Sequence, residues 1–201
     1  MKTPPIPRAL RALARTTAAV AAAALLFAAP DARAQSTSAF CFGDGTDLIG
    51  NCPCGVAQNG TPGSGCLNSS GASGTMVAVG NSCVSVGCGV DTLQLGAVGL
   101  PPAVNGLLVQ GTAALSPGVY LGDGIRCFGG NFLRLFVGQT TTAGNIVFPP
   151  ASTTISARSA ALGDVIPVGG IRHYQIYYRD PPAFCTASPF NLTNGTSVVW
   201  R

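Results

Sequence analysis

This 201-residue chain has few charged residues: Lys, Arg, Asp and Glu together make up 9% of it, and 47% of its residues are hydrophobic. From Gln35 onward the chain has six Arg and six Asp, with no Lys and no Glu, so its formal net charge is zero. Surfaces that bind phosphates need clustered Lys and Arg side chains, and this pattern therefore excludes a nucleic-acid partner.

The first 34 residues have the three parts of a secretory signal peptide. A basic start from Lys2 to Arg15 is followed by a short apolar run, and Ala32-Arg33-Ala34 has the small-x-small pattern of a cleavage site. The run is shorter than the roughly 20 residues that a membrane-spanning helix needs, although an N-terminal anchor or a buried helix is the alternative. We expect export to the cell surface or the extracellular medium, with the periplasm as a further location, and no transmembrane segment in the mature chain.

Residues 35–201 have the length of one domain. They are rich in Gly, Pro, Ser, Thr and Val, with a turn signal about every ten residues, which is typical of β-sandwiches and jelly rolls. We therefore predict an all-β, disulfide-stabilised sandwich or jelly roll, with a cysteine-rich loop segment at 35–72 and the sandwich body at 73–201.

Short β patterns recur through that body, and no amphipathic helix of useful length is visible. Alternating apolar and polar residues in Phe132–Phe136 indicate a half-buried strand at Phe132–Val137. Arg172–Asp180 is the longest β pattern and should end at Pro181 and Pro182, and Asn194-Gly195 is a strong signal for a type I′ hairpin turn. The remaining expected strands are Thr75–Val79, Thr92–Val98, Gly106–Gly111, Val119–Leu121, Asn145–Phe148, Thr153–Ala157 and Thr196–Trp200.

All eight cysteines follow the leader, and an even number in an exported chain predicts four disulfides. A zinc site is the alternative, but Cys52-x-Cys54 is closer than the usual spacing of paired zinc ligands. Spacing favours a Cys83–Cys88 bridge and local bridges within the loop segment, which leaves Cys127 to pair with Cys185. The four cysteines of the loop segment are Cys41, Cys52, Cys54 and Cys66.

Catalytic signals are scarce. His173 is the only histidine of the chain, and no Gly-x-Ser-x-Gly nucleophile elbow is present. A histidine inside an aromatic strand is more typical of a partly exposed or a hydrogen-bonded core residue than of a triad base. We predict no catalytic residues and no cofactor.

Two kinds of binding site are considered. Asp44, Asp47 and Asp123 lie in Gly-rich turns and are candidate calcium ligands, although aspartates also stabilise such turns. Tyr174, Tyr177, Tyr178 and Trp200 could form an aromatic platform for sugars. A regular strand places Tyr177 on the opposite face from Tyr174 and Tyr178, so at least one face belongs to the core. Tyr177 and Trp200 are the candidate glycan contacts.

A series of short landmarks covers nearly all of the mature chain. It resembles a family of secreted proteins and repeat modules predicted in planctomycetes and myxobacteria. The landmarks are CFGDG at Cys41, CPCG at Cys52, GCLNS at Gly65, GLPP at Gly99, GDGIRC at Gly122, HYQIYYRD at His173 and FNLTNG at Phe190 with its terminal VVW. The resemblance implies an exported bacterial β module, found singly or within larger surface proteins, to whose pattern Cys83 and Cys88 are an addition.

We therefore predict a secreted, non-catalytic structural or adhesive surface module. Its partner is unknown, with an extracellular polysaccharide or a cell-surface protein as the two kinds considered. A carbohydrate-binding module is the alternative function, and a small extracellular hydrolase is a further one.

Overall fold

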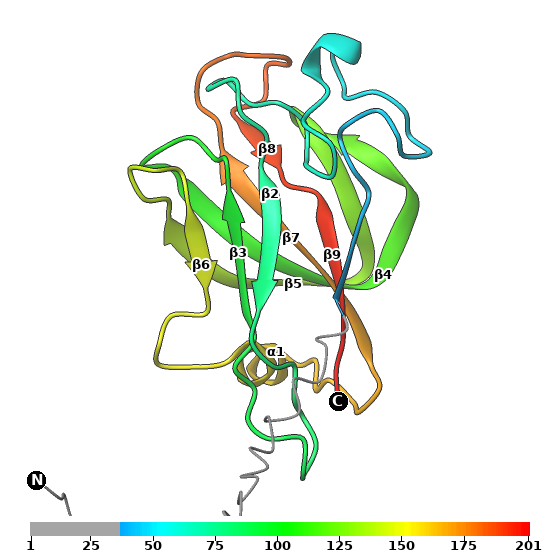
Figure 1. The fold of residues 1–201 in the computed structure, drawn as a ribbon, viewed down its shortest axis with the longest axis vertical. Coiled ribbons are helices and arrows are strands. Elements are labelled where there is room, and N and C mark those ends of the chain that lie inside the picture. Colours follow the sequence, from blue (N-terminus) through cyan, green and yellow to red (C-terminus); the bar gives the residue numbers. More distant parts are fainter. Residues whose placement is uncertain (1–36) are drawn as a thin grey trace, which may run out of the picture. The chain divides into compact units, whose positions relative to one another are not determined.

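Two antiparallel sheets pack face to face in residues 37–201, which are the residues that this computed structural model describes (Figure 1). The expected signal peptide lies outside them. The larger sheet has the strand order β1-β9-β7-β4-β5, and β8 also pairs with β7, whereas the smaller sheet has the order β2-β3-β6. The strands are β1 Thr37–Phe40, β2 Thr75–Val79, β3 Gln94–Val98, β4 Asn105–Leu121, β5 Gly124–Gln139, β6 Ile146–Phe148, β7 Ile171–Arg179, β8 Phe190–Leu192 and β9 Gly195–Val199.

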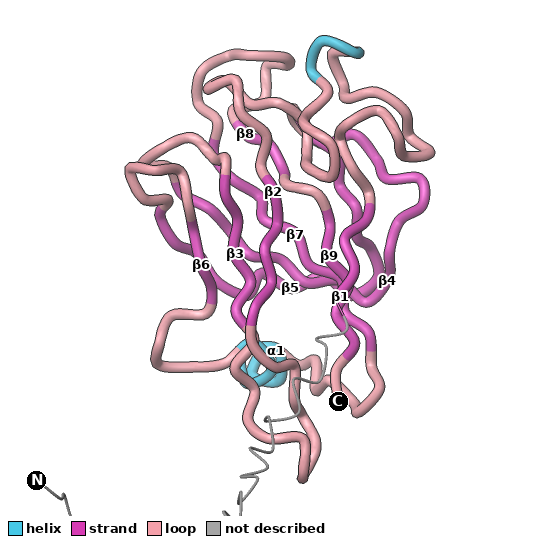
Figure 2. Tube along the Cα trace, in the orientation of Figure 1, coloured by secondary structure: helices cyan, strands magenta, loops and turns pink. Residues whose placement is uncertain are grey.

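This architecture confirms the predicted disulfide-rich, all-β fold. Strands dominate the described chain, and the segment between β1 and β2 is loop apart from the short 3-10 helix η1, Val56–Gln58 (Figure 2). In residues 37–201, no helix has the length and apolarity that crossing a membrane would require.

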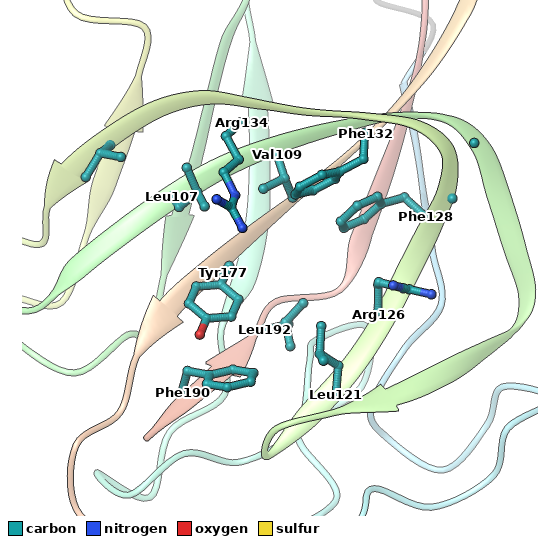
Figure 3. A pocket seen from close by; sticks show the side chains of 13 residues that line it. Leu107, Val109, Leu121, Arg126, Phe128, Phe132, Arg134, Tyr177, Phe190 and Leu192 are labelled. Carbon is teal, nitrogen blue, oxygen red and sulfur yellow. The ribbon is translucent and has the colours of Figure 1, made fainter. Parts of the chain in front are cut away.

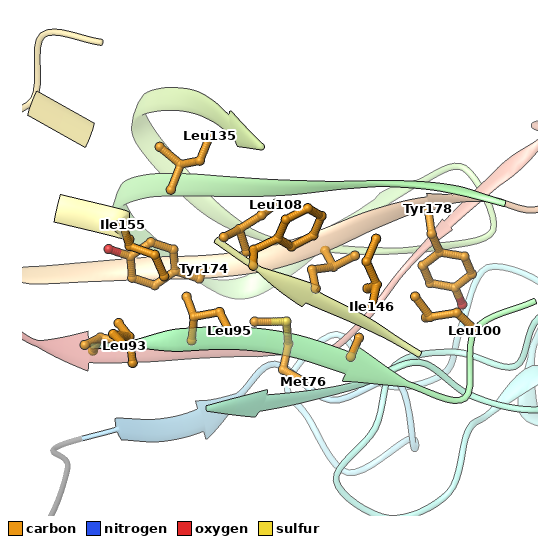
Figure 4. Packing of buried hydrophobic residues seen from close by; sticks show 14 of the residues in the cluster. Met76, Leu93, Leu95, Leu100, Leu108, Leu135, Ile146, Ile155, Tyr174 and Tyr178 are labelled. Atoms are coloured by element: carbon orange, nitrogen blue, oxygen red, sulfur yellow. The ribbon is translucent and has the colours of Figure 1, made fainter. Parts of the chain in front are cut away.

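The main core fills the space between the sheets. β7 contributes Tyr174, Ile176 and Tyr178, which alternate along the strand and are fully buried against Leu95 of β3 and other apolar side chains (Figure 4). Trp200 lies in the same core and donates its indole N–H to the Tyr174 hydroxyl at 3.2 Å. Burying an aromatic ring with its polar atom hydrogen-bonded keeps the apolar gain without an unpaired donor.

The strand expected at Thr153–Ala157 is wrong, because helix α1, Ile155–Ala161, occupies this segment. Thr154 caps the helix, since its hydroxyl accepts a hydrogen bond from the Ala157 amide at 3.1 Å. Ile155 is buried in the main core. The β-branched residues at the start of the segment thus serve as a cap and a core contact, and the Ser and Ala residues that follow allow helix formation.

The hairpin expected at Asn194-Gly195 is also wrong. β8 and β9 pair with β7 one after the other in the same direction, and neither Asn194 nor Gly195 has the positive φ that a type I′ turn requires. The register between β7 and its partner shifts by one residue at Thr193-Asn194. Asn194 is buried, and its side-chain oxygen accepts a hydrogen bond from the Met76 amide in the other sheet at 2.8 Å.

The predicted strands Gly106–Gly111 and Val119–Leu121 are parts of one long strand, β4, which pairs with an equally extended β5. Three register irregularities interrupt this pairing, and Gly130 in β5 has a φ of 72°, which favours glycine. Figure 1 shows the two strands curling together at one side of the sheet. We call the far part of this hairpin, residues 112–130, the curl.

The disulfides differ from those predicted. Cys83–Cys88 and Cys52–Cys66 are bridged, but the predicted Cys127–Cys185 bridge is wrong: Cys127 pairs with Cys41 and Cys185 pairs with Cys54. The curl carries Cys127 back to the end of β1, where it meets Cys41. No free cysteine remains in residues 37–201. The loop segment is thus bridged across the fold, and three of its cysteines, Cys41, Cys52 and Cys66, form a second small core with Ile125 and Cys127 of the curl.

Candidate functional site

A groove of about 780 Å³ lies between the outer face of the larger sheet and the inner side of the curl (Figure 3). Its base comes from the outward-facing residues of β4, β7 and β8, and its wall comes from β5 and the end of β4. The lining residues are Leu107, Val109, Leu121, Arg126, Phe128, Gly129, Gly130, Phe132, Arg134, Val137, Tyr177, Phe190 and Leu192. Pockets of roughly 300–1,000 Å³ with apolar linings and few polar groups are typical ligand sites.

Two stacked aromatic pairs flank the groove. Phe128 and Phe132 have ring centroids 5.4 Å apart and nearly parallel planes, and Tyr177 and Phe190 have centroids 4.5 Å apart. Phe132 is 46% exposed, so part of its ring is accessible to a ligand. Aliphatic side chains lie between the two pairs, which makes the groove a continuous apolar surface with aromatic rings on both sides (Figure 3).

Arg134 brings a positive charge to this apolar surface. Its side chain points from β5 across the groove toward Tyr177, and its guanidinium carbon lies 5.7 Å from the centre of the Phe132 ring (Figure 3). Burial raises the pKa of Tyr177, and the neighbouring Arg179 and Arg134 partly oppose this rise. The phenol therefore remains neutral at physiological pH and is available as a hydrogen-bond donor.

Gln175 and one disulfide fasten the curl to the sheet. The buried Gln175 amide donates to the carbonyl oxygens of Ile125 at 2.7 Å and Thr193 at 2.5 Å, and its side-chain oxygen accepts from the Cys127 amide at 3.1 Å. The Cys41–Cys127 bridge adds a covalent link at the same place. Both links act on β5, the strand that forms the wall of the groove, and so hold this wall in place.

A second set of contacts holds the turn of the curl. Gln58 of η1 donates to the Asp123 carbonyl oxygen at 2.5 Å, and the Asp123 carboxylate accepts from the Thr186 amide at 2.7 Å. Cys54–Cys185 joins the same two loops. The cysteine-rich loop segment therefore supports the end of the hairpin that forms one wall of the groove.

The three candidate calcium ligands lie in separate hydrogen-bond networks. Asp44 accepts from the amides of Thr46 and Gly63, Asp47 accepts from the Phe42 amide at 3.0 Å, and Asp123 is buried against Thr186. These contacts match the turn-stabilising role that was the alternative explanation. Among the described residues, no group of three or more His, Cys, Asp or Glu side chains is arranged to hold a metal ion.

His173 is half-buried on the outer face of β7. Its Nδ1 atom lies 2.8 Å from the Ser197 hydroxyl, and its ring contacts the edge of Phe40. Burial, and then the charge of Arg172, lowers the pKa of His173. Within residues 37–201, none of the carboxylates hydrogen-bonds to the other nitrogen of this ring, and Asp164 is held by Arg172 and Gln110. The serine and histidine are thus paired without the third member of a triad.

The four aromatic residues considered for sugar binding separate into two groups. Tyr174, Tyr178 and Trp200 are fully buried and offer no surface to a ligand, so Trp200 is not a glycan contact. Tyr177 lies on the opposite face, as the strand periodicity predicts, and lines the groove. Phe132, Arg134 and Phe190 also line the groove and were not predicted as site residues. The alternation in Phe132–Phe136 nevertheless places Phe132 and Arg134 together on one face of the strand.

Comparisons of this chain with family models, with curated proteins and with solved structures find no match. The resemblance to the planctomycete and myxobacterial modules stays a prediction.

Proposed function

We propose that this protein is an exported, non-catalytic adhesive module that binds its partner in the groove beneath the curl. The observation that carries this proposal is the groove itself, because it combines exposed aromatic rings with the guanidinium of Arg134, which points across the groove, on an otherwise charge-poor chain. Apolar concave surfaces with a few well-placed polar groups are the usual form of a binding site.

The rigidity of the site supports binding over chemistry. The curl is held by Gln175, by the Cys41–Cys127 bridge and by the contacts of Asp123, so a ligand meets a wall that is already in place. A preorganised site reduces the ordering cost that association must overcome. Four bridges are also suited to an oxidising compartment outside the cytoplasm, which agrees with the expected export.

A carbohydrate-binding module is the second candidate function. The stacked rings of Tyr177 and Phe190 favour it, because flat aromatic faces pack against the apolar faces of sugar rings. An acidic sugar would also find a cation in Arg134.

A ligand panel followed by nuclear magnetic resonance tests the proposed function. The oxidised, exported protein is titrated with polysaccharides, short peptides and amphiphiles, and we expect the ligands that bind to shift the amide resonances of β4, β5 and β7 around the groove. Phe132→Ala should weaken this binding at least fivefold. Val165→Ala, which removes an exposed apolar side chain outside the groove, is the matched control and should leave binding unchanged. Shifts confined to another surface, or equal effects of the two variants, would refute the groove as the binding site.

A further inference from the structure

We propose that the ligand of this groove is a long-chain carboxylate, that is, a single apolar molecule with one anionic head group that pairs with Arg134. This inference rests on the proposed function and names the ligand class of the same site. It follows from the chemistry of the lining, from the unpaired charge of Arg134 and from the small number of other polar side chains in the groove.

The lining is apolar except at three side chains. Only Arg126, Arg134 and Tyr177 carry polar side-chain atoms among the residues around the groove, and the others are Leu, Val, Phe and Gly. An apolar chain gains free energy from every methylene that it buries on such a surface. A sugar or a peptide would instead bring many hydroxyl or amide groups, which lose free energy when they are buried without partners.

The backbone of the base offers no replacement for those partners. β4 pairs with β5 on one side and with β7 on the other through Leu107 and Val109, so its amides and carbonyls are used within the sheet. The residues Leu107, Val109 and Tyr177 at the base of the groove also project from the face of the sheet, whereas an extended peptide adds as a strand along an edge. These features favour an apolar chain over a polysaccharide or a peptide.

Arg134 has no anionic partner in the described chain. The single ion pair in residues 37–201 joins Arg172 to Asp164, and the contact of the Arg134 guanidinium is the Phe132 ring. The aspartates are all engaged elsewhere, and none lines the groove: they are Asp44, Asp47, Asp91, Asp123, Asp164 and Asp180. A carboxylate on the ligand would supply the missing charge and form a charge-assisted hydrogen bond with this guanidinium.

Isothermal titration calorimetry with monomeric dodecanoate, below its micelle concentration, tests the inference. We expect one molecule to bind per protein, with decanoate binding about 15-fold more weakly because each buried methylene contributes roughly a factor of four. Dodecyltrimethylammonium, which has the same chain and the opposite charge, should bind at least tenfold more weakly than dodecanoate.

Arginine variants test where the carboxylate head group of the ligand binds. Arg134→Gln should weaken dodecanoate binding about tenfold or more and leave the binding of neutral dodecyl maltoside unchanged, since it removes a charge-assisted hydrogen bond. Arg158→Gln is the matched control, because Arg158 lies on α1 and outside the groove, and it should change binding less than threefold. Unchanged melting temperatures show that both variants are folded.

Several results would overturn the inference. Equal binding of the cationic and anionic chains, equal losses in the two arginine variants, or binding to anionic vesicles without binding of the monomer would each contradict it. If a polysaccharide or a peptide shifts the resonances of the groove while dodecanoate does not, the inference fails and the proposed function stands. If no ligand of any class reaches the groove, both fail.

Discussion

Removing the Cys41–Cys127 bridge should destabilise the protein far more than removing Cys83–Cys88. The first bridge joins residues 86 positions apart and the second joins residues 5 positions apart. Chain entropy alone gives about 4.5 kcal/mol for the long loop and about 2 kcal/mol for the short one. The bridges Cys52–Cys66 and Cys83–Cys88 lie inside the long loop and shorten it, which reduces its contribution by only about 0.2 kcal/mol, so that it stays above about 4 kcal/mol.

The test is a pair of double variants, Cys41→Ser/Cys127→Ser and Cys83→Ser/Cys88→Ser, so that neither leaves a free thiol. A loss of about 4 kcal/mol lowers the melting temperature by roughly 8–16 °C in a domain of this size. Calorimetry gives the melting temperature of each variant, and urea titration gives its free energy of unfolding. The first should also bind groove ligands more weakly, since Cys127 lies between the lining residues Arg126 and Phe128. Equal losses of stability, or a larger loss in the Cys83/Cys88 variant, would refute the loop-length argument.

Two further predictions concern stability. Tyr174→Phe should lower the free energy of unfolding, measured in urea, by about 1–3 kcal/mol, because it leaves the Trp200 indole N–H buried without its acceptor. Tyr177→Phe on the outer face should lower it much less, and equal losses would contradict the contribution of the buried hydrogen bond. Hydrogen bonds from Arg172 lower the pKa of Asp164 below its usual 3.8, so this carboxylate stabilises the fold above that value and its contribution is lost as the pH falls through the lower folded pKa. Urea midpoints measured from pH 6 to pH 2 should therefore fall less steeply in Asp164→Asn than in the unmodified protein, and parallel curves would show that this pair does not contribute.

Sequence patterns were sufficient for the fold class because turn spacing and strand alternation depend on neighbouring residues. The alternation in Phe132–Phe136 lies within β5, and the pattern predicted at Arg172–Asp180 corresponds to β7, which ends at Arg179. The hairpin prediction at Asn194-Gly195 failed because of a contact with a residue that is distant in the sequence. The Asn194 side chain accepts a hydrogen bond from the Met76 amide in the other sheet, and that contact stabilises a register shift in place of a turn.

The binding groove was only partly predictable. The strand period correctly separates Tyr177 from the buried Tyr174 and Tyr178, and the same reasoning groups Phe132 with Arg134. The face of β7 that carries Tyr177 and the face of β5 that carries Phe132 and Arg134 meet because the long β4–β5 hairpin bends back over its own sheet. That bend depends on register irregularities and on hydrogen bonds between distant residues, such as those of Gln175, and neither leaves a local signature in the sequence.

The bridge pattern has a consequence for the order in which the chain can mature. Cys41 and Cys52 are near neighbours in sequence, but the native partner of Cys41 lies 86 positions away and that of Cys54 lies 131 positions away. Closing a loop becomes harder with length by about 0.6 kcal/mol per doubling, and 86 residues are about three doublings more than the Cys41–Cys52 spacing. Oxidation of a chain that is still being made thus favours bonds between near neighbours, such as Cys41 with Cys52, over the two long-range native bridges. Reaching the native set requires those early bonds to be exchanged, so the yield of correctly bridged protein should depend on a thiol–disulfide exchange catalyst in the compartment where it folds.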